Sequence, residues 1–337
     1  MADTELTCAN RQCRVVEDGK CVEGYDELNQ CPFYGREPDA EEEQDHDAQD
    51  SQPAFDGIEL LDALALRSGR ANRVLAALPS RMIGIVGVYN SGKTSIISGL
   101  FDLFQMGPVA DVKFAGSSTL HGLEMICHDV RVASQRDEAH SERTKRGEVR
   151  FYHLDVRDRS GLQTLLIADR SGEEYEEVAD LTANASAMFE LRRADVITVL
   201  VDGRRLSLPA EGADAIGAIP LIIQGMVENE AFARRPNLAI VLTKNDWVQA
   251  SPRKDRVQQD FEAVVQRIRT EFADRFGEMK PFVTSASPKD MNVARGAGLA
   301  ELLEFWLKPN AAPKGDRVEF SSRRVIDRFV IRETDID

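Results

Sequence analysis

A complete P-loop constrains the fold of this chain more than any other feature of its sequence. Residues Gly87 to Thr94 read Gly-Val-Tyr-Asn-Ser-Gly-Lys-Thr; they follow a short apolar run, Met82–Gly87, and precede a helix-like stretch, Ser95–Gln105. In such a loop the glycines let backbone N–H groups turn toward a phosphate, the lysine reaches the β- and γ-phosphates, and the hydroxyl ligates Mg²⁺. An ordinary glycine turn is the alternative, but it does not require a strand and a helix on either side. The segment therefore predicts a nucleoside triphosphate site.

The composition predicts a soluble globular protein with one large domain and short appendages. The 337 residues are 42% hydrophobic, which is enough to fill a core of that size. No apolar run approaches the roughly 18 residues that a membrane helix needs. The acidic start, Met1–Glu5, argues against a signal peptide, so we expect a cytoplasmic location and no membrane insertion. The net charge of −15 argues against broad binding to nucleic acid or to anionic lipid.

Four of the five cysteines lie within the first 31 residues, in a stretch with little apolar content. In a reducing compartment they favour a tetrahedral Zn²⁺ site over two disulfides, because such a site supplies folding energy that a very small core lacks. The spacing departs from paired C-x2-C knuckles, so an iron–sulfur cluster and unligated or redox thiols remain alternatives. We expect a cysteine-rich module over residues 1–38, through which any nucleic acid would bind. Its Zn²⁺ ligands would be Cys8, Cys13, Cys21 and Cys31.

The segments around the P-loop divide the rest of the chain. Between Asp39 and Asp50 there are seven acidic residues and no apolar side chain larger than alanine, which is typical of a solvated linker. Apolar residues, Leu64 and Ala65 among them, then recur at helical spacing up to Pro79. We therefore expect an acidic linker over 39–55, a helical lead-in over 56–80, the P-loop domain over 81–310 and a tail over 311–337.

From Met82 onward, short β-rich apolar runs alternate with helical patterns. This alternation predicts an α/β fold with a mostly parallel, doubly wound sheet. The second and third expected strands are joined only by Arg157–Gly161, which is too short for a parallel crossover but suits a hairpin. The second strand should therefore be antiparallel to the third. The expected strands are 82–87, 149–156, 162–168, 196–202, 237–243 and 281–284.

Three later segments place polar residues at the ends of buried strands. Asp169 ends one strand, and its carboxylate can hold Mg²⁺, while the N–H of Gly172 can meet a γ-phosphate oxygen. Another strand ends in Thr-Lys-Asn-Asp, where Asp246 can accept two hydrogen bonds from guanine groups that adenine lacks, with the stem of Lys244 over the base. The last strand ends in Thr-Ser-Ala at residues 284–286, where a backbone N–H can meet guanine O6. All four motifs lie at carboxyl ends of strands, where α/β sheets bind ligands.

These residues together resemble the Ras-like GTPases of the translation-factor-related class, over about Arg81 to Pro309. The resemblance implies guanine-nucleotide binding, GTP hydrolysis and a two-state switch. By that resemblance Lys93 binds the β- and γ-phosphates, Thr94 and Asp169 hold Mg²⁺, and Gly172 contacts the γ-phosphate. One departure is Thr243, where the family more often has asparagine. The remaining nucleotide-binding positions implied are Gly87, Asn90, Ser91, Gly92, Ser95, Lys244, Asp246, Ser285 and Ala286.

A narrower resemblance links the chain to the bacterial double-GTPase families. The segments that carry it are Ala115–Glu124, Glu142–Thr144 and Phe151–Leu154. These families are encoded in pairs, within gene neighbourhoods associated with conflict and anti-phage defence. The resemblance implies a protein partner that is itself a GTPase.

The residues for the first switch and for catalysis follow from the same resemblance. Thr144 stands just before the second expected strand, where the family places a threonine that reaches Mg²⁺ and the γ-phosphate; Thr119 is the alternative, and it also suits a helix N-cap. Glu173 replaces the water-orienting glutamine, and its charge is repelled by the phosphate, so intrinsic turnover should be slow. We expect a partner to supply positive charge, with Arg143 or Arg170 as weaker candidates.

Two other functions compete with the GTPase switch. The chain could hold GTP with little hydrolysis and act as an interaction module, and the rate of hydrolysis discriminates this from the switch. A P-loop ATPase is the third alternative, but it requires both the Thr-Lys-Asn-Asp and the Thr-Ser-Ala segments to be coincidences.

Overall fold

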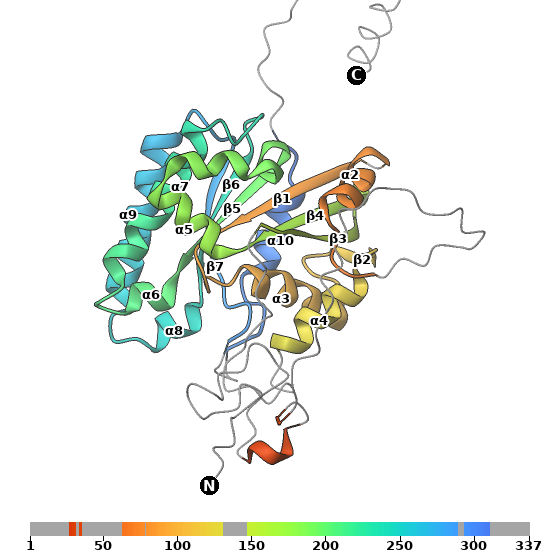
Figure 1. Ribbon diagram of the computed structural model, residues 1–337, viewed down its shortest axis with the longest axis horizontal. Coiled ribbons are helices and arrows are strands. Elements are labelled where there is room, and N and C mark those ends of the chain that lie inside the picture. Colours follow the sequence, from red (N-terminus) through yellow and green to blue (C-terminus); the bar gives the residue numbers. More distant parts are fainter. Residues whose placement is uncertain are drawn as a thin grey trace, which may run out of the picture.

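The computed structural model describes residues 27–31, 34–35, 63–77, 79–130, 147–288 and 293–310. In this part of the chain a sheet of seven strands lies at the centre, in the order β2-β3-β4-β1-β5-β6-β7 (Figure 1). The strands are β1 Ser80–Val86, β2 Lys113–Gly116, β3 Val149–Asp158, β4 Gly161–Arg170, β5 Val196–Asp202, β6 Asn237–Thr243 and β7 Met279–Val283.

The predicted mixture of parallel and antiparallel strands is confirmed. Strands β4, β1, β5, β6 and β7 run parallel, and β3 pairs antiparallel with β4 in a hairpin that runs from Val149 opposite Arg170 to Asp158 opposite Gly161. The sequence analysis did not predict β2, a four-residue edge strand antiparallel to β3. Such a short edge strand carries little periodicity of its own, and its pairing with β3 defines it.

Helices cover both faces of the sheet, so the fold is doubly wound as predicted. On one face α2, α5, α7 and α9 pack over a core that includes Tyr175 and Val264. On the other face α3, α4 and α10 pack over Ile97, Leu123 and Trp306. The α-helices are α2 Ser68–Ala77, α3 Lys93–Met106, α4 Leu120–Val130, α5 Gly172–Asp180, α6 Gly203–Ser207, α7 Gly212–Glu228, α8 Asn245–Ala250, α9 Lys254–Phe272 and α10 Leu299–Leu307, and short 3-10 helices span Leu28–Gln30, Thr182–Ala187 and Phe189–Arg193.

The central strand β1 is apolar from Met82 onward because it is buried on both faces from there. Met82 and Val86 belong to the core on one face, whereas Ile83 and Ile85 belong to the core on the other. A strand buried on both faces reads as a continuous apolar run rather than as an alternation. Because β1, β4, β5, β6 and β7 run parallel, their carboxyl ends meet at one edge of the sheet. The loops after these strands form the candidate site.

The segment before β1 corrects one prediction. A helix is present over Ser68–Ala77, but Leu64 and Ala65 are not helical. Leu66 instead pairs with Phe151 of β3 through two backbone hydrogen bonds of 2.8 and 2.9 Å. The prediction of a helix at Leu64 and Ala65 was wrong because pairing of this segment with a distant strand outweighs its local periodicity.

Several predicted segments lie wholly or largely outside the described residues. These are the cysteine-rich module apart from residues 27–31 and 34–35, the acidic linker 39–55, and the tail 311–337. Among the described helices, none has the length and apolar character that crossing a membrane requires.

Candidate nucleotide-binding site

The P-loop makes a tight turn between β1 and α3. Asn90 and Gly92 have positive φ angles of 57° and 96°, and the amide of Ser91 closes the turn on the carbonyl oxygen of Val88 at 3.2 Å. A Cβ added at Gly87 would lie 2.5 Å from the Ser91 hydroxyl oxygen and 3.1 Å from the Cβ of Leu200, so a larger residue would crowd the turn. Because α3 begins at Lys93, the first N–H groups of that helix face the loop, as they do in phosphate-binding sites.

Lys93 is buried inside this loop. Its Nζ donates hydrogen bonds to the carbonyl oxygens of Gly87 at 2.9 Å and of Val88 at 3.1 Å. Burial lowers the pKa of Lys93 to about 8, although the nearby carboxylates of Asp169 and Glu176 oppose the shift. An ammonium group held in so dry a place is poised to bind an anion, because a phosphate would replace the lost solvation.

Thr94 and Asp169, two of the three predicted Mg²⁺ ligands, lie together. The Thr94 hydroxyl donates to Oδ2 of Asp169 at 3.0 Å. Within the described residues no group of three or more His, Cys, Asp and Glu side chains is arranged to hold a metal ion. Mg²⁺ nevertheless suits this pair, because it prefers hard oxygen donors and takes most of its ligands from phosphates and water.

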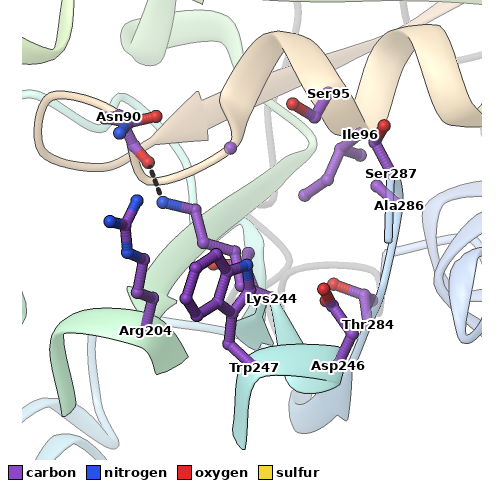
Figure 2. A pocket seen from close by; sticks show the side chains of 12 residues that line it. Asn90, Ser95, Ile96, Arg204, Lys244, Asp246, Trp247, Thr284, Ala286 and Ser287 are labelled. Carbon is purple, nitrogen blue, oxygen red and sulfur yellow. Dashed lines mark hydrogen bonds between the residues drawn. The ribbon is translucent and has the colours of Figure 1, made fainter. Parts of the chain in front are cut away.

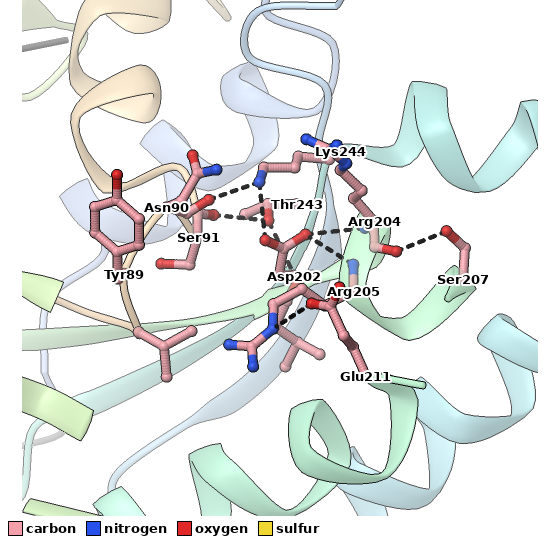
Figure 3. A network of polar contacts seen from close by, with 12 residues as sticks. Tyr89, Asn90, Ser91, Asp202, Arg204, Arg205, Ser207, Glu211, Thr243 and Lys244 are labelled. Atoms are coloured by element: carbon pink, nitrogen blue, oxygen red, sulfur yellow. Dashed lines mark hydrogen bonds and ion pairs between the residues drawn. The ribbon is translucent and has the colours of Figure 1, made fainter. Parts of the chain in front are cut away.

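The loop after β6 is tied directly to the P-loop (Figure 3). The Thr243 hydroxyl donates to the carbonyl oxygen of Ser91 at 2.8 Å. Lys244 has a positive φ of 54°, and its Nζ donates to the carbonyl oxygen of Asn90 at 2.6 Å and pairs with Oδ2 of Asp202 at 2.8 Å. The predicted base-reading loop and the predicted phosphate loop are therefore one connected structure.

Asp202 holds this connection in place, and the sequence analysis did not single it out. Besides its bond to Lys244, its Oδ1 accepts the backbone amides of Arg204 at 2.9 Å and Arg205 at 3.3 Å, which caps α6. The available signal was an aspartate at the end of a buried strand just before a glycine. That signal does not separate a capping residue from a ligand-binding one.

A cavity opens beside this network, between the P-loop, α8 and the loop after β7 (Figure 2). It is called the base cavity below, because the predicted base-reading residue Asp246 lines it. The backbone amide of Asp246 donates to the Ser285 hydroxyl at 3.1 Å, so the last strand positions the carboxylate-bearing turn. Five lining residues were not among the predicted site residues: Ile96, Arg204, Trp247, Thr284 and Ser287. The predicted residues that line the cavity are Asn90, Gly92, Ser95, Thr243, Lys244, Asp246 and Ala286.

The segment after Asp169 packs against the P-loop. A Cβ added at Gly172 would lie 2.4 Å from the Tyr89 amide nitrogen, so only glycine allows this approach. Four residues later on the same helix, Glu176 accepts that amide through Oε1 at 3.1 Å. Glu173, the predicted water-orienting residue, is half-buried in the first turn of α5.

Arg170 does not take the catalytic role considered for it. It is buried and its guanidinium binds Glu190 at 2.7 and 2.9 Å, together with Glu174 and the carbonyl oxygen of Ala187. Burial by itself lowers the pKa of Arg170, and the bonds to Glu190 outweigh that effect and raise it. The side chain is thus committed to fixing α5 against the segment before β5. Arg143, the other candidate, lies outside the described residues.

Of the two candidate switch threonines, only Thr119 lies within the described residues, and Thr144 lies outside them. Thr119 is fully buried directly before α4, and its Oγ1 accepts the backbone amide of His153 at 2.9 Å in the middle of β3. Its hydroxyl therefore anchors α4 and β2 to the sheet, away from the carboxyl edge where the P-loop lies.

The zinc prediction stays a prediction. Cys8, Cys13 and Cys21 lie outside the described residues, whereas Cys31 is described, is buried and forms no disulfide with the other described cysteine. Cys127 is fully buried in α4, where its thiol donates to the carbonyl oxygen of Ser98 at 3.3 Å and the side chain packs as a small hydrophobic residue.

The P-loop, the Asp169–Gly172 turn and the base cavity follow one another in this order along the chain, at the carboxyl ends of a doubly wound sheet, and define a P-loop GTP-binding domain. The model of the family Double-GTPase 2 matches residues 81–307, and the chain belongs to this family. The matched segment covers the sheet and every predicted nucleotide-contacting residue.

Comparison with solved structures finds similar chains at low identity. One is the signal recognition particle receptor SRb-GTP/SRX complex from Chaetomium thermophilum, with 13% identity, a TM-score of 0.40, and coverage of 68% of this chain and 96% of that one. Another is Methanosarcina barkeri Roco2 RocCORdC bound to GDP, with 13% identity, a TM-score of 0.33, and coverage of 69% and 50%. A search of curated proteins found no match.

Proposed function

We propose that this protein binds GTP and GDP with Mg²⁺, hydrolyses GTP to GDP and phosphate, and acts as a nucleotide-dependent switch. The observation that carries the proposal is the bridge made by Lys244 between the P-loop carbonyl of Asn90 and the carboxylate of Asp202. It ties the loop that carries Asp246 to the P-loop, so that one nucleotide can contact both. The Asp246 carboxylate then accepts hydrogen bonds from guanine N1–H and N2–H₂, which adenine lacks.

The loop after β7 supplies the remaining contact to the base. The Ser285 amide already donates to the carbonyl oxygen of Ala297 at 3.0 Å. We therefore assign the contact with guanine O6 to the backbone N–H of Ala286, which lines the cavity. The small side chain at this position leaves room for the base.

At the phosphate end of the site, residues of the chain bind and orient the phosphates and Mg²⁺. Lys93 meets the β- and γ-phosphates, Thr94 and Asp169 hold Mg²⁺, and the Gly172 N–H meets the γ-phosphate. Mg²⁺, when bound, neutralises charge on the phosphate oxygens. Because Gly172 touches the P-loop backbone, loss of the γ-phosphate is communicated directly to α5.

We propose that hydrolysis is slow until a partner contributes positive charge. Arg170 is held by Glu190 and Glu174, and Glu173 occupies the position where a neutral water-orienting side chain is expected. The family suggests that the partner is a second GTPase, acting in a cytoplasmic bacterial conflict or defence system. Thr144 is the proposed Mg²⁺-contacting switch threonine.

A second candidate function is favoured by the same ion pairs. If no partner completes the site, the chain holds GTP with little hydrolysis and serves as a GTP-stabilised interaction module. The measured rate of hydrolysis separates this function from the switch.

The first experiment is phosphate release by the purified full chain with Mg²⁺ and either GTP or ATP, beside Lys93→Ala, with bound nucleotide identified after denaturation. GTP-selective turnover that is lost in the variant supports the enzyme. Tight guanine nucleotide without turnover supports either the partner-dependent switch or the interaction module, and selectivity for ATP contradicts both.

Base recognition has its own test. Asp246→Asn replaces an acceptor by a donor, so the variant should bind GDP more weakly and xanthosine diphosphate, which carries a carbonyl in place of the 2-amino group, more tightly. Equal weakening of binding for both nucleotides would show that Asp246 does not contact the base.

Glu173→Ala tests the catalytic proposal. Unchanged hydrolysis in the isolated chain and in its complex would leave Glu173 as part of a switch surface only.

We also propose a structural Zn²⁺ bound by Cys8, Cys13, Cys21 and Cys31. Elemental analysis of the purified chain should find about one zinc per molecule, and far less after Cys31→Ser. Zinc retained by the variant would remove Cys31 from the ligand set.

A further inference from the structure

Arg204 and Trp247 meet at the wall of the base cavity, although they come from different elements. Arg204 extends from α6 and Trp247 from α8, and Figure 2 shows both side chains directed toward the P-loop. The guanidinium carbon lies 4.5 Å from the centroid of the indole ring. Both residues line the same cavity as Asp246 and Ala286.

The backbone on each side of this stack is fixed by the groups that bind the nucleotide. Asp202 caps the helix of Arg204 through one carboxylate oxygen and binds Lys244 through the other. The Trp247 amide donates to the carbonyl oxygen of Lys244 at 3.0 Å. Arg204 and Trp247 are therefore held in register with the lysine whose stem faces the base.

We infer that Arg204 and Trp247 form a cation–aromatic wall that packs against the base of the bound guanine nucleotide. The inference rests on the proposed function, because it adds residues to that same site. A guanidinium plane and an indole ring both stack on flat aromatic groups, and neither needs a particular pattern of donors and acceptors. The wall thus supplies affinity, whereas Asp246 supplies selectivity for guanine.

The arginine is tested by GDP affinity and dissociation rate in the full chain. Arg204→Ala should raise the Kd for GDP about tenfold, and Arg204→Lys, which keeps the charge but loses the plane, should lie between it and wild type. Arg205→Ala is the matched control: it removes the next arginine of α6, which pairs with Glu211 at 3.2 Å and does not line the base cavity. It should change the Kd less than about twofold.

Two further readouts separate contact with the base from a structural role. Arg204→Ala should weaken GDP and inosine diphosphate by the same factor, because stacking does not depend on the 2-amino group, and its unfolding midpoint without nucleotide should match that of Arg205→Ala. An Arg204→Ala variant that binds GDP as tightly as Arg205→Ala does would overturn the inference. So would an unequal loss for the two nucleotides.

Trp247 offers a direct signal. The chain has two tryptophans, and the other, Trp306, is fully buried in the core, where its indole N–H donates to the Thr198 hydroxyl at 2.9 Å. GDP should therefore change the fluorescence of wild type but not of Trp247→Phe. If wild type binds GDP without a change in fluorescence, the inference about Arg204 and Trp247 is wrong and the proposed function stands. If wild type binds no guanine nucleotide, the proposed function and this inference are both wrong.

Discussion

The hydroxyl of Thr94 donates a hydrogen bond to Oδ2 of Asp169 at 3.0 Å, joining the first turn of α3 to the carboxyl end of β4. The two residues are far apart in the sequence, and the parallel pairing of β1 with β4 brings them together. Their oxygens lie beside the buried Lys93, where the phosphates of a nucleotide would enter. This pair is the proposed Mg²⁺-binding side of the site.

Asp169→Asn should reduce the dependence of nucleotide binding on Mg²⁺, because an amide is a weaker ligand than a carboxylate. Mg²⁺ should slow GDP release from wild type, and the substitution should reduce that effect by about tenfold or more. The measurement is the rate of GDP release with Mg²⁺ and with EDTA. Asp155→Asn is a suitable control, because Asp155 accepts from the Thr164 hydroxyl at 2.6 Å in an equivalent pair within the sheet. An identical response in both variants would remove Asp169 from the metal site.

Asp202→Asn should weaken both the fold and the nucleotide site. The carboxylate is buried and binds the Lys244 ammonium and two backbone amides. We expect the free energy of unfolding to fall by about 1–3 kcal/mol, and GDP to dissociate faster because Lys244 loses its charged partner. Glu211→Gln, which removes a half-exposed partner of Arg205, should cost less than about 1 kcal/mol. Denaturant unfolding of the two variants tests the difference, and equal losses would contradict the role given to Asp202.

Gly172→Ala should disrupt the contact between α5 and the P-loop. The added methyl group would lie 2.4 Å from the Tyr89 amide nitrogen, so the backbone must move and the bond from that amide to Glu176 must weaken. We expect a loss of about 1–3 kcal/mol in the free energy of unfolding. Gly217→Ala, in the middle of α7 with nothing within 4 Å of the added carbon, should instead gain about 0.5–1 kcal/mol. A shift of the same sign in both variants would show that the clash is relieved cheaply.

His153 should make stability depend on pH. Burial lowers its pKa below the ordinary value of 6.5, although Asp155 opposes the shift. The Nδ1 atom accepts the Ser118 amide at 3.0 Å, which requires that nitrogen to be unprotonated. Since the unfolded chain takes up the proton more readily, the free energy of unfolding should fall as the pH drops below about 6.5 and through the folded pKa. His153→Asn, which keeps an acceptor but does not titrate, should lose less stability over that range in denaturant unfolding; parallel curves would exclude His153 as the source.

The sequence by itself determined the P-loop, the mostly parallel character of the sheet, the hairpin of β3 and β4, and the four motifs of the nucleotide site. Each of these depends on residues that are close together in the chain. A glycine-rich turn between a strand and a helix has few alternative conformations, and a short polar linker such as Arg157–Gly161 permits only a hairpin. For this reason Lys93, Asp169, Lys244 and Asp246 lie at or just beyond strand ends, as predicted, and their contacts with a nucleotide stay predictions.

Only the tertiary structure decided the pairings between distant segments. Leu66 is extended because it pairs with Phe151, and Arg170 is committed because folding buries it against Glu190. Arg204 and Trp247 meet because adjacent parallel strands, β5 and β6, end side by side and start the helices that carry them. Local periodicity carries no information about such partners, since the burial and charge of a side chain depend on residues that only the folded sheet brings near.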